Sequence, residues 1–182
     1  WRNLMALSSK AFLSGGHAVP QVSYEDVEAH AEGLIMLTGG IYGALGRYIL
    51  AGQQNKAAAL LQRLAAAFPG RLYIELMRHG LAQEKQAEEG FIALALEHNV
   101  PLVATNDAYF IHADMFEAHD ALLCIAEGTY VGETERRRLT PRHRLKTPQE
   151  MRALFADLPE ALENTAIIAR RCAFAAPARK PI

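Results

Sequence analysis

Three short apolar segments, separated by helical patterns, constrain the fold of this chain more than any other feature. They span residues 34–37, 72–77 and 101–105 and read LIML, LYIELM and PLVAT. Apolar runs of this length are typical of strands that are buried on both faces of a sheet. Because amphipathic helical patterns lie between them, the sequence predicts parallel βα units with right-handed crossovers. The expected fold class is α/β.

Helix signals fill the rest of the chain. Apolar periodicity marks residues 1–13, and Gly15-Gly16 ends that pattern. Residues suited to helix N-caps mark further starts, namely Ser23, Asn55, Asp114 and Thr147. Thr147 also opens a capping box with Glu150. We expect helices over residues 1–13, 24–30, 42–51, 56–68, 84–98, 114–126 and, in two parts, 148–172.

The composition is that of an ordinary folded domain. The 182 residues are 51% hydrophobic and 21% charged, which excludes a disordered chain, and the net charge is only −1. No stretch approaches the ~18 apolar residues of a membrane span, and no signal peptide stands at the front. Cys124 and Cys172 form no CxxC motif, so we expect two buried thiols in a reducing cytoplasm. The chain opens at Trp1 in what reads as mid-helix, which indicates an internal fragment.

Polar residues gather directly after the predicted strands, at residues 38–40, 79–80 and 105–107, while Glu75 lies inside its strand. In a parallel sheet these positions share one edge, where such folds place their sites. Glu75, His79 and Asp107 could together bind Zn, Mn or Mg. The alternative is that Glu75 bridges to an arginine and Asp107 caps a turn. The sequence lacks the motifs GxGxxG, GxxxxGK[ST], GxSxG and HExxH, so a nucleotide cofactor and a serine nucleophile have no support.

The least regular segment, residues 131–146, is densely basic. Its cationic residues are Arg136, Arg137, Arg138, Arg142, Arg144 and Lys146. Such runs contact phosphate or acidic protein surfaces when they are functional, so these residues are candidate nucleic-acid contacts; the alternative is a solvated loop. The segment has no aromatic residues on which bases could stack.

Five segments together resemble one family. They read GLIMLTGG, FPGRLYIELMRHGL, PLVATNDAYFI, EAHDALLCI and LKTPQEMRALFADLPEALENT. In this order they are similar to the polymerase-and-histidinol-phosphatase (PHP) domain of bacterial DNA polymerase III alpha subunits. The resemblance covers residues 1–175 and implies part of a distorted (β/α)7 TIM-like barrel without its N-terminal strands. Residues 176–182 then read as a linker toward the polymerase core.

The resemblance also implies a multinuclear metal site, held by an H-x-H motif upstream and by a D-x-H motif that falls at residues 107–109. Here the aspartate is Asp107, but the histidine position holds Tyr109. A phenol with a pKa near ~10 is a poor ligand compared with imidazole, so we expect a degenerate metal site. Glu75 and His79 match polar positions of the family.

The resemblance implies two functional hypotheses. In the first, the fragment is a structural domain of a cytoplasmic, DNA-directed DNA polymerase and supports binding of the proofreading exonuclease. The sliding clamp, the clamp loader, DNA and the Mg-dependent polymerase site would be reached through the rest of the parent protein, and the isolated fragment would be inactive. In the second, it is an active metal-dependent phosphoesterase, either a 3′–5′ exonuclease or a pyrophosphatase.

Overall fold

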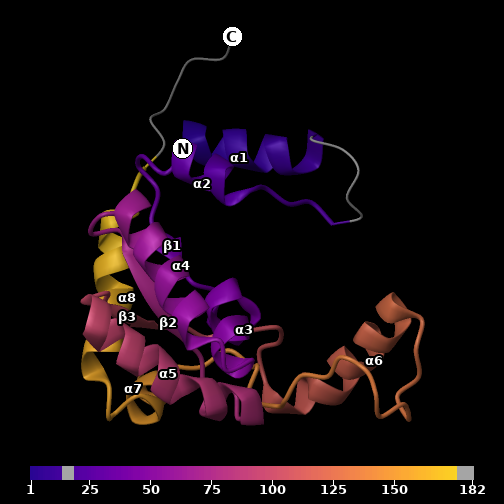
Figure 1. Cartoon of the computed structure of the whole chain (residues 1–182). Coiled ribbons are helices and arrows are strands. Elements are labelled where there is room, and N and C mark those ends of the chain that lie inside the picture. Colours follow the sequence, from indigo (N-terminus) through magenta and orange to yellow (C-terminus); the bar gives the residue numbers. More distant parts are fainter. Residues whose placement is uncertain (14–18, 176–182) are drawn as a thin grey trace.

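The structure is a computed structural model that describes residues 1–13 and 19–175 (Figure 1). The predicted helix stop at Gly15-Gly16 and the predicted linker at residues 176–182 lie outside the described residues. The described chain is a mixed α/β structure built around a small parallel sheet.

The sheet has three strands in the order β1-β2-β3: Met36–Leu37, Leu72–Leu76 and Leu102–Ala104. Both pairs are parallel, as predicted, with Met36 opposite Leu72 and Ile74 opposite Leu102. All five residues of β2 are buried, because it lies between the other two strands. The strand predicted over residues 34–37 is present only at Met36–Leu37, and the prediction that it is buried on both faces is wrong. β1 has only two residues, both half-buried, because it lies at the edge of the sheet.

All the predicted helices are present, with shifted ends. The α-helices are α1 (Arg2–Leu13), α2 (Tyr24–Ala29), α3 (Ala44–Leu50), α4 (Gln54–Ala67), α5 (Ala82–His98), α6 (Phe116–Glu127), α7 (Pro148–Leu154) and α8 (Pro159–Arg171). Two short 3₁₀ turns, η1 (Gly40–Tyr42) and η2 (Ala113–Met115), precede α3 and α6.

The predicted helix caps are confirmed at two of four positions. The side chain of Ser23 accepts a hydrogen bond from the N–H of Asp26, and Thr147 forms the expected capping box with Glu150. Asn55 is not a cap, because α4 already begins at Gln54. Asp114 lies inside η2, so it does not cap α6.

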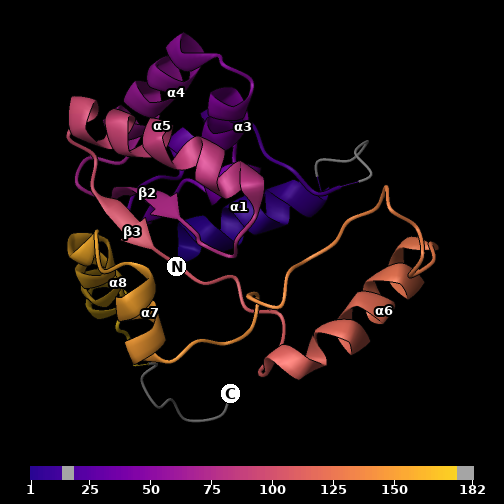
Figure 2. The same cartoon turned by 90° about the horizontal axis from the view of Figure 1, so that it is seen from below.

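The core lies between the sheet and the helices. Figure 2 shows α3, α4 and α5 packed together on one side of the sheet, with α7 and α8 on the other side beside β3. The largest fully buried apolar side chains come from both sides and from the sheet: Leu45, Leu61, Ile74, Leu76, Val103 and Phe155.

Helix α8 also covers the free edge of β3. The side chain of Asn164 donates to the carbonyl of Leu102 at 2.9 Å, and the hydroxyl of Thr165 donates to the carbonyl of Ala104 at 2.8 Å. Backbone groups at a sheet edge need such partners when no further strand supplies them.

Two helices pack only weakly on this body. Helix α6 lies apart from the other helices in both views, and α1 has no buried residue (Figures 1 and 2). A loop returns along α6, where Arg136 forms a bidentate pair with Asp120 at 2.7 and 2.6 Å. Cys124 on α6 is buried as expected, but Cys172 is exposed after α8, so the prediction of two buried thiols is half wrong. Within the described ranges, no helix is long and apolar enough to span a membrane.

Candidate functional site

Glu75 joins the ends of all three strands. One carboxylate oxygen accepts the N–H of Gly39 at 3.0 Å and the other accepts the hydroxyl of Thr105 at 2.7 Å. Its own N–H donates to the hydroxyl of Thr38 at 3.0 Å. The polar residues after the strands therefore meet at one edge of the sheet, as predicted. The alternative that Glu75 bridges to an arginine is wrong, since the donors that hold its buried carboxyl group are neutral.

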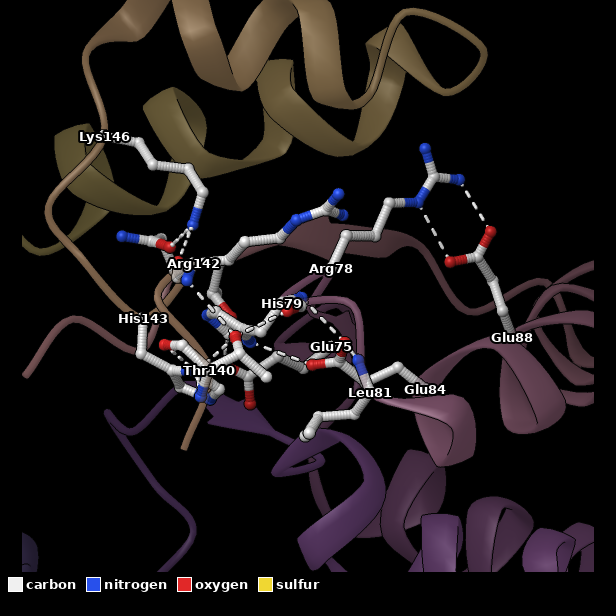
Figure 3. Close-up of polar contacts among 12 residues, drawn as sticks. Glu75, Arg78, His79, Leu81, Glu84, Glu88, Thr140, Arg142, His143 and Lys146 are labelled. Atoms are coloured by element: carbon white, nitrogen blue, oxygen red, sulfur yellow. Dashed lines mark hydrogen bonds and ion pairs between the residues drawn. The ribbon is translucent and has the colours of Figure 1, made fainter. Parts of the chain in front are cut away.

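Beside it, His79 and Glu84 form a buried pair (Figure 3). Nδ1 of His79 lies 2.8 Å from one oxygen of Glu84. The other oxygen accepts the N–H of His79 at 2.7 Å and that of Leu81 at 3.2 Å. Burial raises the pKa of Glu84, but the hydrogen bond and the positive charge of His79 and the two N–H donors outweigh it, so the pKa of Glu84 is lowered.

A second buried imidazole, that of His143, stacks on His79. The ring centroids are 3.9 Å apart and the planes differ by 13°. Thr140 links the two residues, since its N–H donates to Nδ1 of His143 at 3.1 Å and its hydroxyl donates to the carbonyl of His79 at 2.7 Å. Burial, followed by the charge of His79, lowers the pKa of His143, although Thr140, Glu84 and Asp107 oppose this.

Tyr109 lies at the outer side of the imidazole pair. Its ring meets His143 edge-on, with centroids 6.0 Å apart. Burial, and then the charge of half-buried Asp107, raises the pKa of the Tyr109 phenol. Arg137 donates to the Tyr109 hydroxyl at 3.3 Å. The phenol at residue 109 therefore lies near Asp107 and near one of the two stacked imidazoles, that of His143.

A metal ion would need several His, Cys, Asp or Glu side chains that meet at one point. Nε2 of His79 is buried and has no hydrogen-bond partner among the described residues, while Nδ1 is held by a carboxylate, as is common for histidine ligands. However, nowhere in the described chain do three His, Cys, Asp or Glu side chains come together in a way that could hold one ion. The described residues alone therefore do not fit a metal ion.

The basic segment does not form one cationic surface. Arg136 is buried against Asp120, and Arg144 forms a bidentate pair with Glu150. Exposed Arg137 and Arg138 lie near the α6 side, over the rings of Tyr109 and Phe116. The two remaining side chains, those of Arg142 and Lys146, lie near Arg78 and the end of β2, as Figure 3 shows.

Comparison of the sequence with known proteins shows which family part of this chain resembles. Residues 1–79 match the model of the PHP domain. Residues 1–79 therefore belong to the PHP domain family. Along its whole length it is also similar to DNA polymerase III subunit alpha: 50% identical over 181 residues in Caulobacter vibrioides and 38% over 183 residues in Rickettsia bellii, covering 99% and 100% of this chain. A third relative, from Pseudomonas aeruginosa, is 41% identical over 174 residues, which is 94% of this chain. The chain spans only 15–16% of the length of these relatives.

The structure also reveals site residues that were not predicted from the sequence. Glu84 had a usable signal, because it lies three residues after Leu81, at the start of α5, where an acidic side chain can cap the helix. His143 had none, because only the folded loop brings it onto His79. Arg78 also had none. It binds Glu88 on α5 at 2.9 and 2.6 Å and Asp157 before α8 at 2.6 and 2.8 Å, so it ties the end of β2 to both sides of the sheet.

Proposed function

We propose that this chain is a segment of a DNA polymerase III alpha subunit whose PHP domain is a structural and interaction unit with a degenerate metal site. Similarity to alpha subunits over 94–100% of the chain supports this assignment. In this proposal the parent protein is a cytoplasmic DNA-directed DNA polymerase that acts in replication. Its Mg-dependent polymerase site lies outside this segment, and the three parallel strands are part of a distorted (β/α)7 barrel.

The observation that carries the proposal is the position of Tyr109. The resemblance places a metal-binding histidine there, and the structure has instead a phenol whose ring meets that of His143 edge-on at 6.0 Å and whose pKa is raised by burial and by the charge of Asp107. A neutral phenol with a raised pKa is a weaker ligand than imidazole at neutral pH. Asp107, Glu75 and His79 would then be vestigial ligands. Buried Glu75 instead holds three strand ends together, which is a structural role.

The partner in this proposal is the separate proofreading exonuclease, which would dock on the PHP domain. The rest of the alpha subunit packs around the segment, the clamp and the clamp loader are contacted elsewhere in that subunit, and DNA is bound by the parent protein. The test is binding of purified exonuclease to the full-length alpha subunit, with and without chelator. We expect tight binding that chelator leaves unchanged. Failure to bind, or binding that requires metal, would contradict the structural role.

One observation favours a second candidate, a metal-dependent phosphoesterase. The unpartnered Nε2 of His79, with Glu84 on Nδ1, has the surroundings of a histidine ligand. Residues from elsewhere in the parent protein would have to complete the site. Release of nucleotides from the 3′ end of a labelled oligonucleotide, abolished by chelator and by Asp107→Ala, would support this candidate over the structural role.

A further inference from the structure

Two adjoining hollows lie beside the end of β2, on the side away from α6. One has a volume of about 240 Å³ and the other about 400 Å³. Arg78, Arg142 and Leu154 line both of them, so they form one groove between the start of α5 and α7. Figure 3 shows Arg142 next to Arg78, with Lys146 on the far side of it.

Cationic side chains dominate the lining of this groove: Arg78, Lys85, Arg142, Arg144 and Lys146. Three carboxylates also line it, but each is already engaged. Glu84 is held by His79, Glu88 by Arg78 and Glu150 by Arg144. Within the described ranges, Lys85, Arg142 and Lys146 have no carboxylate within ion-pair distance. The groove therefore carries uncompensated positive charge.

The backbone holds Arg142 at the centre of this charge. Gly80 has a positive φ of 81°, and a Cβ there would lie 3.2 Å from a guanidinium nitrogen of Arg142. The positive φ favours glycine at this position, and the missing side chain leaves space beside the Arg142 guanidinium. Nζ of Lys146 meanwhile donates to Asn106 and to the carbonyl of Arg142. Burial, and then the charge of Arg144, lowers the pKa of Lys146, although Glu150 and Glu84 oppose this.

We infer that this groove binds adjacent phosphate groups of a phosphodiester or polyphosphate chain, with Arg142 between two successive phosphates. A guanidinium binds phosphate oxygens in a bidentate manner, and two hollows that share Arg142 suit two neighbouring anionic groups. The groove has no aromatic lining on which a base could stack, so the contact is to phosphate and independent of base sequence. This inference does not depend on the state of the metal site.

The test uses the 182-residue chain and two probes, a fluorescein-labelled oligo(dT) and inorganic tripolyphosphate as a competitor. Arg142→Gln should weaken oligo(dT) binding about five- to tenfold and reduce the salt dependence by about 0.7 in log–log slope. Lys85→Gln, at the other end of the groove, should weaken binding in the same direction. The matched control is Arg152→Gln, because Arg152 is an exposed arginine of α7 that lines neither hollow. The control should stay within about twofold of the wild type.

Either probe supports the inference if its binding is lost with Arg142→Gln and retained with Arg152→Gln. Oligo(dT) binding that tripolyphosphate does not displace identifies a nucleic-acid backbone, and binding of tripolyphosphate alone identifies a free polyphosphate. The inference is overturned if neither probe binds, if Arg142→Gln and Arg152→Gln have equal effects, or if an oligoglutamate peptide displaces the bound probe. Both groove variants change exposed side chains, so circular dichroism should match that of the wild type.

Discussion

At the scale of single residues, the carboxylate of Glu84 is the centre of the candidate site. It accepts hydrogen bonds from two backbone N–H groups and from the ring of His79, and this holds the imidazole under His143. A buried carboxylate is costly unless its oxygens are satisfied, and here they are. The turn after β2 and the start of α5 therefore depend on this side chain for their conformation.

Replacing Glu84 with Gln should lower the free energy of unfolding by about 1–3 kcal/mol at pH 7, because the amide cannot accept all of these hydrogen bonds. The pKa of Glu84 is lower in the folded chain than its ordinary value of 4.5. Its contribution is therefore complete above that value and is lost as the pH falls through the folded pKa. Urea unfolding from pH 7 down to the acid range should show the gap between wild type and variant closing at low pH. Exposed Glu89→Gln is the control, and a gap that stays constant with pH would contradict this assignment.

At the scale of elements, α8 replaces a neighbouring strand along the open side of β3. Asn164 and Thr165 bind two carbonyls of that strand, and Arg78 binds Asp157 just before α8 begins. These contacts join the C-terminal helices to the sheet. Each links residues more than sixty positions apart in the sequence.

Asn164→Ala and Thr165→Val should each destabilise the chain by about 1 kcal/mol, because each leaves a carbonyl of β3 without its partner. The double variant should lose roughly the sum of the two, since the two carbonyls are separate acceptors. Denaturant unfolding measures the effect, and exposed Glu163→Gln on the same helix should leave stability within about 0.5 kcal/mol of the wild type. Unchanged stability in the double variant would show that α8 does not support the edge of β3.

The parts of the fold that depend on local sequence could be predicted. The three strands and the capping box at Thr147 follow from neighbouring residues alone. The short length of β1 could not be predicted from local sequence, because it reflects the position of this strand at the edge of the sheet. Asp114 was mistaken for a cap because a 3₁₀ turn and a helix start have the same polar signal.

For the candidate site, the sequence predicted only that its residues lie at the ends of the strands. That Glu75, His79 and Asp107 follow or interrupt strands was visible in the sequence. The neutral partners of Glu75 come from positions 36 and 30 residues away, and the stacking of His143 on His79 depends on how a loop closes. Local pattern contains no information on such contacts, so Arg78 and His143 could be found only in the structure.

At the scale of the whole molecule, the described chain has a well-packed body and two less supported helices. All residues of β2 are buried, whereas α1 has no buried residue and α6 only two, Asp120 and Cys124. Stability is not uniform in such a structure, because segments with few buried contacts open without the rest.

Hydrogen exchange should therefore be slowest in β2 and in the helices packed on it, α4 and α5, and fastest in α1 and α6. Exchange followed by mass spectrometry on peptides from each element measures this order. Weakening the buried pair with Arg136→Gln should speed exchange in α6 and leave β2 unchanged, because Asp120 and Arg136 tie only α6 to its returning loop. Protection of α6 equal to that of β2 would contradict this description.

The metal content of the full-length alpha subunit tests most directly whether the site around Asp107 and Tyr109 is degenerate. Elemental analysis should find Zn and Mn well below stoichiometric amounts, and Asp107→Ala should leave those amounts unchanged. Stoichiometric Zn or Mn that Asp107→Ala removes, together with nuclease activity that chelator abolishes, would contradict the structural account.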